Sequence, residues 1–361
     1  MGYLLGRPFR LTTPSRMKVC IFKNDRLGDF VLAIGAIRQL ALRHGESNCL
    51  LLVSTYTKEL AEAEFPGMPQ LEIPAFGVDY TFEGLRRCLY YRRLLGAYEF
   101  EQLVCLRHQC TSFQELCLSW IRAAKTIRLQ NDILTGKHNQ FSAKIECCEA
   151  YPAQAPSQMC LELEAHRIIV EKSVGEAVAP GIVLPRLCRP ASSGEEAILV
   201  SPFGSASIKE YPLEKLCEVL KRVQGVLKIP IWISCAESQK ARADQLDADL
   251  QKSGCSQVHV LRTPLLADFI GMVARASVVL TVDTSTAHIA AAMDKRTVVI
   301  LGGGLHGRFG PWWRSERQCW MTHPVDCLGC GWECKHPSPY CITHISADKL
   351  TDVTIQLHKK K

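Results

Sequence analysis

The sequence has no long uninterrupted hydrophobic run. No window approaches the roughly 18 consecutive apolar residues that a membrane-spanning helix needs. The N-terminal segment carries Arg7 and Arg10 and has no apolar run long enough for a signal peptide. Because the chain also has no fixed short repeat and no low-complexity tract, a solenoid is excluded. These absences together predict a cytoplasmic globular protein.

The chain also has no large excess of positive or negative charge. The 361 residues carry a formal net charge of only +7. That charge suits an acidic partner, such as a phosphorylated or nucleotide-bearing ligand, but it is too mild to indicate nucleic acid. Hydrophobic residues make up 47% of the chain and charged residues 22%, which excludes a disordered chain. The length predicts two domains instead of one core.

Cysteine is abundant, with 18 residues in the chain. Most stand singly in apolar stretches that read as strands or helices, where a reduced thiol behaves as a small hydrophobe. Examples are Cys20, Cys105, Cys217 and Cys235. The cysteine count therefore does not predict a secreted disulfide scaffold.

Two series of alternating strand-like and helical segments divide the chain. In the first, strands are predicted within residues 18–24, 48–54 and 100–107, and helices at 29–44 and 113–122. In the second, strands are predicted within residues 197–204, 229–236, 257–261, 276–283 and 297–304, and helices at 213–223, 239–251, 265–274 and 287–293.

This alternation predicts the α/β class, with one parallel sheet covered on both faces in each half. The expected units are an N-terminal Rossmann-like domain (1–180), a linker rich in Pro, Ser and Gly (181–196), a second Rossmann-like domain (197–345), and a C-terminal helix with a basic tail (346–361). Ligands of such proteins bind where strands end and helices begin, in the cleft between the domains.

Polar side chains cluster where a predicted strand meets an alanine-rich helix, in LTVDTSTAHIAAAM. The cluster contains Asp283, Thr284, Ser285 and His288. Free backbone N–H groups at a helix start carry the positive end of the helix dipole, and hydroxyls add donors, so this turn suits a diphosphate. Asp283 would repel phosphate, and we expect it to cap the helix or orient its neighbours. The alternative is an ordinary capped helix with His288 in the core.

A second polar loop, KNDRLGD, ends another predicted strand and opens an apolar helix. A carboxylate such as Asp29 suits a general base that accepts a proton from a substrate hydroxyl. The alternative is that Asp29 only caps the helix. The helix dipole is expected to lower the pKa of Asp29, which would make it a weaker base.

A third loop, SPFGSASIKEYP, joins a predicted strand to a predicted helix. Its glycine and serines, among them Ser205, allow close approach to a phosphate, and Lys209 would neutralise the phosphate charge. Taken alone, Lys209 reads equally well as a solvated loop lysine.

These three segments, in this order, resemble glycosyltransferase family 9, the heptosyltransferases of lipopolysaccharide core assembly. The resemblance runs from Lys18 over nearly the whole chain, and its anchors are KNDRLGDFVLAIGAIRQL, SPFGSASIKEYPLEKL and VDTSTAHIAAAMDKRTVVILGG. It implies the GT-B fold, in which two Rossmann-like domains face a central cleft. It also implies transfer of heptose from ADP-heptose with inversion and without a catalytic metal.

The resemblance assigns roles by position. Asp29 becomes the general base on the acceptor hydroxyl, in the N-terminal domain, and Lys209 contacts the donor phosphates. The diphosphate is held by Asp283, Thr284, Ser285 and His288. Family members commonly have glycine where this sequence has Ser285. For the ribose of the donor, Glu237 is the nearest acidic residue, although the register equally allows Gln239.

Many glycosyltransferases hold a catalytic metal with an Asp-x-Asp triplet. The one such triplet here, Asp247-Ala248-Asp249, stands in a predicted helix whose Leu246 and Leu250 face inward. The triplet is thus interpreted as part of a solvated helix face, and no catalytic metal is predicted.

Four cysteines crowd a turn-rich segment, DCLGCGWECKHPSPYC. A C-x₂-C pair followed by two more cysteines is typical of a small metal knuckle, because close thiolates complete a tetrahedral shell around structural zinc or iron. Reduced surface thiols and a disulfide pair are the alternatives. The predicted ligands are Cys327, Cys330, Cys334 and Cys341, with His336 and His344 in reserve. Cysteine-rich tails also occur in family 9, including autotransporter heptosyltransferases with an iron-bound finger.

Basic and aromatic residues alternate in GLRRCLYYRRLLGAY. A helix of this composition suits an acidic glycan or lipid-linked acceptor, or peripheral contact with the inner membrane. The ordinary solvated face of an amphipathic helix is the alternative. The basic residues are Arg86, Arg87, Arg92 and Arg93.

The leading functional hypothesis is an enzyme that moves heptose, or a similar sugar, from a nucleotide-diphosphate sugar to an acceptor glycan of the lipopolysaccharide core. A protein acceptor, such as an autotransporter, is one alternative. A nucleotide-sugar epimerase on the same architecture is another. A non-enzymatic metal-finger interaction protein is the third, and it is disfavoured because the finger lacks a dense basic and aromatic surround.

Overall fold

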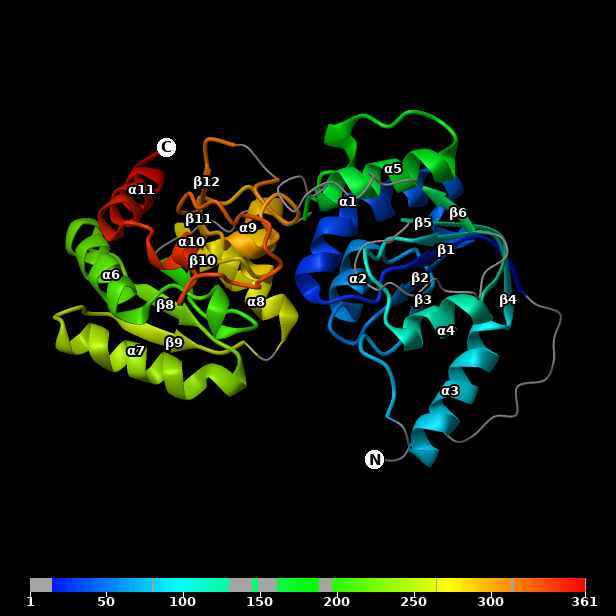
Figure 1. Ribbon diagram of the computed structural model, residues 1–361, viewed down its shortest axis with the longest axis horizontal. Helices are drawn as coiled ribbons and strands as arrows, with labels where there is room; N and C mark the ends of the chain where they lie inside the picture. The colour runs from blue at the N-terminus through cyan, green and yellow to red at the C-terminus, as the bar shows by residue number, and fades with distance from the viewer. Residues whose placement is uncertain are drawn as a thin grey trace.

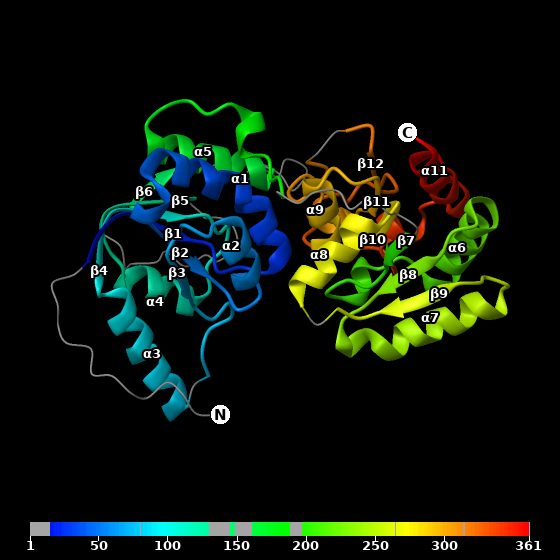
Figure 2. The same cartoon turned by 180° about the vertical axis from the view of Figure 1, so that it is seen from behind.

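The computed structural model describes residues 15–79, 81–129, 145–148, 161–187, 197–263, 265–312 and 315–360. Two six-stranded parallel sheets, one in each half, form the framework of the molecule. Figures 1 and 2 show the two halves side by side, each with helices on both faces of its sheet. The predicted α/β class with two parallel-sheet domains is confirmed.

The N-terminal sheet has the strand order β3-β2-β1-β4-β5-β6. Its strands are β1 (Ser15–Phe22), β2 (Cys49–Val53), β3 (Gln70–Glu72), β4 (Tyr98–Cys105), β5 (Arg122–Leu129) and β6 (Ile145–Cys148). Its helices are α1 (Leu27–His44), α2 (Lys58–Glu64), α3 (Phe82–Leu95), α4 (Ser112–Trp120) and α5 (Glu162–Val174). β1 is central and buried at its carboxyl end, so the loop that follows it opens at the middle of the sheet edge.

The C-terminal sheet has the strand order β12-β11-β10-β7-β8-β9. Its strands are β7 (Ile198–Ser201), β8 (Ile231–Ser234), β9 (Val258–Leu261), β10 (Val278–Val282), β11 (Thr297–Ile300) and β12 (Gln318–Met321). Its helices are α6 (Leu213–Leu227), α7 (Lys240–Lys252), α8 (Leu266–Arg275), α9 (Ser285–Ala292), α10 (Tyr340–Thr343) and α11 (Ala347–Lys359). The order reverses between β10 and β7, which is where a ligand is expected in such a sheet.

The two domains share one apolar cluster. It joins α1 and α5 of the first domain to α8 and α9 of the second, and it includes Ile34, Ile37, Ile289 and Met272. The polypeptide between the domains packs on α1, where Gly35 lets it approach: a Cβ at that position would stand 2.1 Å from the carbonyl oxygen of Val183. Because the interface is a true hydrophobic core, the halves pack as neighbours instead of hanging from a free linker.

A polar contact also crosses the interface. The Glu59 carboxylate of α2 accepts hydrogen bonds from the backbone N–H groups of Leu266 and Ala267, at 3.1 and 2.8 Å. These are two of the otherwise unsatisfied donors in the first turn of α8. A side chain of one domain therefore caps a helix of the other.

The predicted segments match the structure closely. Every predicted strand and helix is found, and the predicted C-terminal helix is α11. One boundary is wrong: the helix predicted over residues 113–122 ends at Trp120, because Arg122 begins β5 and pairs with Glu99 of β4. Within the predicted linker, residues 180–183 form a short 3₁₀ turn against α1. None of the helices in the described residues is both long and apolar enough to cross a membrane.

Candidate active site

Asp29 lies in the first turn of α1, directly beyond the central strand β1. The residue that precedes the helix is Arg26, and no side chain caps this end. Asp29 is the third residue of the helix and does not cap it, so the alternative interpretation of Asp29 as a simple N-cap is wrong. Its carboxylate is partly exposed at the carboxyl edge of the sheet.

A buried ion cluster stands beside Asp29. Lys23 has no exposed surface, and its Nζ lies 2.8 Å from Oδ2 of Asp25 and donates to the carbonyl oxygen of Leu106 at 2.9 Å. Arg107 pairs with the other oxygen of Asp25 and donates to the backbone oxygen of Asn24 at 2.8 Å. Burial alone would lower the pKa of Lys23, but Asp25 and then Glu162 outweigh burial and raise it.

Glu162 extends this cluster to the second domain. It is almost fully buried at the start of α5, with Nζ of Lys23 at 3.9 Å and Nε of Arg308 at 3.3 Å. Its backbone N–H also donates to the carbonyl oxygen of Arg308 at 2.9 Å. Burial would raise the pKa of Glu162, but the neighbouring His166, Lys23 and Arg308 lower it to about 2. The carboxylate is thus ionised, and the domains are joined through a buried ion pair.

The pKa of Asp29 is raised to about 6, chiefly by burial and then by the negative charge of Asp25. Lys23 acts in the opposite direction, as Arg308 does more weakly. The expectation that the helix dipole would lower this pKa is therefore wrong, because desolvation and a like charge outweigh a dipole that acts only within the first turn. A carboxyl with a pKa of about 6 is a stronger base than an ordinary aspartate, yet ionised at neutral pH.

The polar cluster of the second domain stands at the start of α9. Thr284 is the N-cap residue, but no side-chain hydrogen bond caps the helix. Asp283 instead faces His288, whose Nε2 lies 3.7 Å from its Oδ1. The expectation that Asp283 caps the helix is wrong, and the alternative, that it orients a neighbour, fits. The first backbone N–H groups of α9 are left for another acceptor.

His288 is buried against two indole rings. Its Nδ1 accepts a hydrogen bond from Nε1 of Trp312 at 3.0 Å, and it stacks on that ring with centroids 6.3 Å apart. The ring of Trp320 also lies 6.3 Å away. Burial lowers the pKa of His288 although Asp283 acts to raise it. His288 is thus a positioned residue that holds Asp283, and little of its surface is free for a ligand.

The structure brings the two polar loops together across the domain interface. A Cβ at Gly28 would lie 3.1 Å from Cδ2 of His288 and 3.4 Å from Cα of Ser285. Gly28 immediately precedes Asp29, so the turn of α1 that carries this carboxylate packs against the uncapped start of α9. Two motifs more than 250 residues apart in the chain therefore form one site.

The remaining predicted donor residues lie at the neighbouring strand ends. Lys209, in the 3₁₀ turn Ser207–Lys209 after β7, places its Nζ 5.1 Å from the centroid of the Trp332 ring. Ser205 is exposed in the same loop. Glu237 follows β8 and pairs with Arg262, with most of its side chain exposed. Gln239, the alternative for that role, donates to the carbonyl oxygen of Gly204 at 3.4 Å.

The Asp-x-Asp triplet lies on α7, where Leu246 and Leu250 face inward as predicted. The carboxylates of Asp247 and Asp249 accept hydrogen bonds from Gln251 and Gln245 on the exposed side of the same helix. The triplet is therefore an ordinary helix surface, remote from the strand ends that carry the site.

The four C-terminal cysteines gather in one small lobe, residues 326–341, which we call the knuckle. Burial first, and then Cys330, Cys341 and Cys327, raise the pKa of the Cys334 thiol. Sγ of Cys341 accepts a hydrogen bond from the backbone N–H of Gly303 at 3.2 Å. These influences put the four thiols in one lobe, but among the described residues no three of the cysteines bring their sulfur atoms within 4.8 Å of one another.

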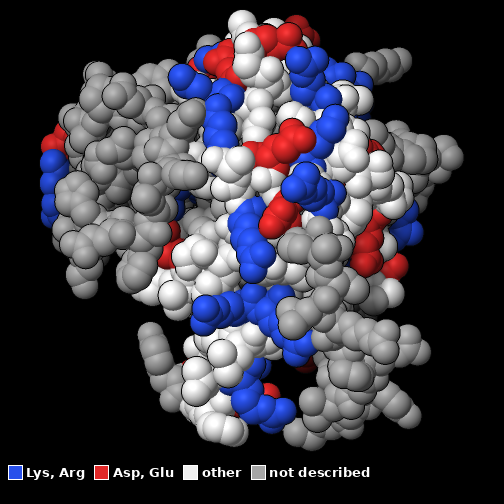
Figure 3. Space-filling model, turned by 90° about the vertical axis from the view of Figure 1, so that its right-hand side faces the viewer, with Lys and Arg blue, Asp and Glu red and all other residues white. Residues whose placement is uncertain are grey.

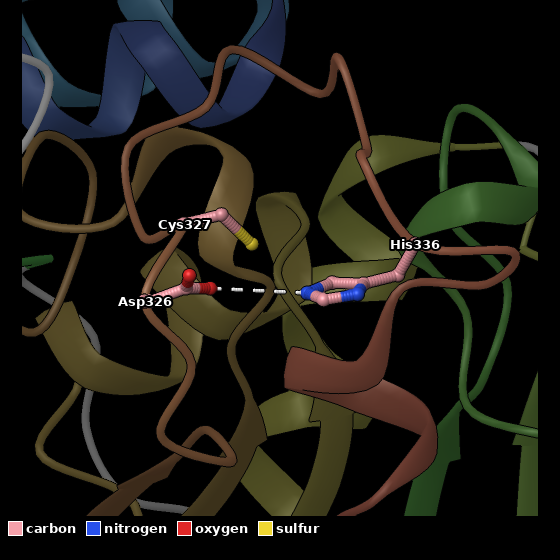
Figure 4. A group of neighbouring side chains, drawn as sticks. All are labelled: Asp326, Cys327 and His336. Carbon is pink, nitrogen blue, oxygen red and sulfur yellow. Dashed lines mark ion pairs between the residues drawn. The ribbon is translucent and has the colours of Figure 1, made fainter.

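A second set of potential ligands meets in the same lobe. Asp326, Cys327 and His336 hold their ligand atoms within 4.8 Å of one another, and Figure 4 shows the imidazole of His336 directed at the Asp326 carboxylate. The ring of His336 stacks on Tyr340, which stacks in turn on His344. The reserve ligand His336 is thus the one that the structure places beside Cys327.

Several residues of the site escaped the sequence analysis. Lys23 and Asp25 come directly after the buried central strand β1, and charged residues at that position could have been predicted to belong to the site. Glu162 and Arg308 come from segments about 146 positions apart, and they meet only through the domain interface. Trp312 and Trp332 carried no signal, because a tryptophan in a loop is ordinary by composition.

The family model for glycosyltransferase family 9 (heptosyltransferase) matches residues 180–331. The resemblance predicted from the motifs is confirmed, and the C-terminal half of the chain carries a family 9 glycosyltransferase domain. The matched residues include Lys209, Asp283 and His288, whereas Asp29 lies outside them. No curated protein matches the chain by sequence.

Solved structures of similar proteins share the GT-B fold with this chain. The E. coli heptosyltransferase WaaC with ADP has a TM-score of 0.65 at 17% identity and covers 94% of this chain and 100% of its own. A family 9 glycosyltransferase from Veillonella parvula has a TM-score of 0.70 at 12% identity, over 95% and 97%. The iron-containing glycosyltransferase TibC from enterotoxigenic E. coli has 0.53 at 11%, over 97% and 78%.

The raised pKa of Asp29 has a consequence for stability that needs no substrate. The folded pKa of about 6 exceeds the ordinary aspartate value of 3.8, so the folded state binds more protons between these values and stability falls as pH rises through them. We expect Asp29→Asn to raise the free energy of unfolding by about 1–3 kcal/mol at pH 8 and to have little effect below pH ~4, measured by urea denaturation.

Glu162→Gln is the matched control of opposite sign. The folded pKa of Glu162, about 2, lies below the ordinary glutamate value of 4.5, so the contribution of Glu162 to stability is present above that value and is lost as pH falls toward 2. We expect this variant to be less stable than the parent at pH 8. An Asp29→Asn variant that is also destabilised at pH 8 would contradict the assigned pKa.

Proposed function

We propose that the protein is an inverting glycosyltransferase that moves heptose, or a closely similar sugar, from ADP-heptose to an acceptor hydroxyl. The observation that carries this proposal is the close approach of the first turn of α1, which carries Asp29, to the uncapped start of α9, where a Cβ on Gly28 would lie 3.4 Å from Cα of Ser285. Such a pairing sets a base from one domain opposite an anion-binding turn of the other, which is the arrangement that an inverting displacement needs.

In the proposed reaction the acceptor oxygen attacks the anomeric carbon as the bond to the diphosphate breaks. The acceptor proton passes to the carboxylate of Asp29, and the electron pair of the broken bond leaves with ADP. The N–H groups at the start of α9, together with Lys209, stabilise the negative charge that develops on the diphosphate. No step requires a metal ion, and catalysis is proposed to be metal-independent.

The charges around Asp29 fit it for this task. Its pKa of about 6 keeps most of the carboxylate ionised at neutral pH and makes proton uptake more favourable than for an ordinary aspartate. His108, in the same cluster, has a pKa lowered to about 4, first by burial and then by Arg308. Because His108 is neutral above that pH, the acid limb of the pH–rate profile is expected to report Asp29.

The choice of donor and acceptor rests on the family match and on relatives. WaaC has been solved with ADP and with an ADP-2-deoxy-2-fluoro heptose, and TibC with ADP-D-β-D-heptose. We propose ADP-heptose as the donor, and the lipopolysaccharide core as the acceptor, with a cytoplasmic site of action. A protein acceptor is the main alternative, because the cysteine-rich segment resembles the iron-bound finger of autotransporter heptosyltransferases.

Replacing the base tests the proposal. Asp29→Asn is expected to lower the turnover of ADP-heptose by about 10²–10⁴-fold, because it removes the proton acceptor while leaving the phosphate-binding turn intact. The measurement is ADP release in the presence of acceptor, alongside the dissociation constant for ADP. Asp247→Asn, which changes a partly exposed aspartate on α7, is the control and should keep normal turnover.

Three outcomes of that assay would contradict the proposal. Near-normal turnover of Asp29→Asn would remove Asp29 from the role of base. Interconversion of the sugar without an acceptor would favour an epimerase, a class that shares this fold at a TM-score of 0.51 in the UDP-GlcNAc 2-epimerase of Methanocaldococcus jannaschii. A protein that binds no nucleotide sugar at all would favour the non-enzymatic metal-finger hypothesis.

We also propose that the knuckle binds one structural zinc or iron ion. When bound, the ion would cross-link a lobe that otherwise has only short secondary structure and few packed side chains. The proposed ligands are Cys327, Cys330, Cys334 and Cys341, with His336 able to replace one thiolate.

Metal analysis of the purified protein tests the knuckle. We expect about one zinc or iron per chain in the parent, and a loss of more than half of it in Cys330→Ser. Cys235→Ser, which changes a cysteine of the same domain outside the knuckle, is the control and should keep the metal. A metal-free parent purified without chelators, with all four thiols reactive, would refute the site.

Helix α3 is proposed to hold the enzyme against an anionic membrane surface. It buries only Gly84 and Leu95, whereas Phe82, Leu85 and Leu89 are 79%, 57% and 57% exposed. These three recur at helical spacing opposite the buried residues and so form an apolar stripe on the solvent side. The helix carries four arginines, Arg86, Arg87, Arg92 and Arg93, against one glutamate.

Charge complementarity favours a lipid surface over a protein partner. Arginines flank the apolar stripe of α3, and this combination suits anionic head groups with the leucines inserted between them. Figure 3, which looks onto the outer end of the N-terminal domain, shows Lys and Arg side chains gathered along the described surface with fewer Asp and Glu among them.

Vesicle sedimentation tests the membrane contact. We expect binding to phosphatidylglycerol vesicles but not to phosphatidylcholine vesicles, and a roughly tenfold loss of affinity in Leu85→Ser/Leu89→Ser. Leu42→Ser is the control, because Leu42 is 73% exposed at the end of α1, away from the stripe. Equal binding to both vesicle types, or an equal loss in the control, would contradict the role of α3.

A further inference from the structure

The knuckle directs one side chain out of its own lobe. Trp332, between Cys330 and Cys334, has a φ of +73°, in the left-handed region that a bulky side chain rarely adopts. Its neighbour Gly331 has a φ of +65°. A strained conformation persists only where the surroundings hold it in place, and such residues are frequent at functional sites.

The ring of Trp332 packs on the loop that follows β11. A Cβ on Gly304 would meet three atoms of the ring, the nearest at 2.3 Å, and a Cβ on Gly302 would meet the ring at 2.2 Å. The ring therefore lies directly against the backbone at Gly302 and Gly304, where glycine has no side chain to block it. Side chains at these two positions would expel it.

Backbone hydrogen bonds fix the knuckle to the same loop. The N–H of Gly331 donates to the carbonyl oxygen of Gly304 at 2.8 Å, and the N–H of Gly329 donates to that of Gly303 at 2.7 Å. The N–H of Gly303 in turn donates to Sγ of Cys341 at 3.2 Å. The position of Trp332 is thus set from both sides, by the knuckle and by the glycine loop.

The ring of Trp332 also receives Lys209, whose Nζ lies 5.1 Å from the ring centroid. In the sheet, β10 lies between β11 and β7. The glycine loop follows β11, and Lys209 follows β7. A ring that contacts both must reach across the carboxyl end of β10, which is where Asp283 and the uncapped start of α9 stand.

We propose that Trp332 is a positioning residue that aims Lys209 at the donor diphosphate, so that the knuckle forms one wall of the donor site. The proposal rests on the role given to Lys209 in the proposed function. A lysine on a four-carbon chain samples many rotamers, and a cation–π contact with a fixed indole restricts it to the side where the phosphates are expected. The knuckle thereby contributes to donor affinity without touching the reacting atoms.

The test is a double-mutant cycle on ADP binding, measured by calorimetry with the full-length protein. Lys209→Met and Trp332→Leu are each expected to weaken ADP binding, Trp332→Leu by about 3- to 30-fold. Combined with Lys209→Met, Trp332→Leu should cost little more, because the tryptophan acts through the lysine. Trp332→Phe keeps an aromatic face and should recover most of the loss.

Gly304→Ala provides a second route that leaves both side chains unchanged. The three atoms nearest to its added Cβ all belong to the Trp332 ring, so this variant should weaken ADP binding to a similar degree as Trp332→Leu. This variant, and Trp332→Phe, keep the test valid if Trp332→Leu fails to fold. Thermal unfolding of each variant identifies such a failure.

The outcomes separate this inference from the proposed function. If Lys209→Met weakens ADP binding but Trp332→Leu does not, Lys209 keeps its donor role and the positioning role of Trp332 is refuted. Fully additive losses in the double variant would also refute it, since a merely structural tryptophan would act independently of Lys209. If the parent protein binds no ADP, the proposed function fails and the inference fails with it.

Discussion

The packing of α1 on α9 is the contact on which the site depends. These helices belong to different domains, yet they share one hydrophobic cluster and approach so closely that Gly28 touches His288 and Ser285. The closeness is what puts a carboxylate from the first sheet edge beside a helix start from the second. Burial of the apolar faces drives the two domains together, but the hydrophobic effect does not depend on direction. Their relative orientation must therefore be set by polar contacts. Those contacts are the Glu59 cap on α8 and the Glu162–Arg308 ion pair.

The ion pair also links the domain interface to the electrostatics of the base. Arg308 belongs to the second domain and lowers the pKa of Asp29, whereas Asp25 and Glu162 of the first domain raise it. The value of about 6 therefore belongs to the joined domains.

The sequence predicts most of the fold because parallel α/β architecture has a local signature. A continuous apolar run such as VVLTV indicates a strand that is buried on both faces. The apolar spacing in α6 and α8 indicates helices that are buried on one face. Both patterns can be recognised from neighbouring residues in the chain alone. The motifs also predict that Asp29 and Asp283 lie at strand ends. The strands β3, β5, β6 and β12 escape the sequence analysis. β3 has only three residues and shows no period, and β5 (RAAKTIRL) has two arginines, a lysine and a threonine among its apolar residues.

The sequence does not predict the direction in which the pKa of a site residue is shifted. The local argument, a carboxylate in the first turn of a helix, gives a lowered pKa for Asp29, and it fails because the neighbours that decide the value come from distant segments. Asp283 shows the same limit. Helical spacing predicts that His288 lies near it, but the sequence does not predict that Asp283 leaves the start of α9 uncapped. Local rules fix the position of such side chains, while tertiary contacts fix their charge.

The geometry at Gly28 and Ser285 gives a physical reason for a departure from the family pattern. Ser285 stands where relatives commonly have glycine, and a side chain there takes space at the start of α9. The opposing residue is Gly28, and a Cβ on it would already be tight against His288 at 3.1 Å. With a bare backbone on one side of the contact, the other side has room for a side chain without separating α1 from α9. A serine at the start of α9 is compatible with an anion site, because a hydroxyl donates to an anion as backbone N–H groups do.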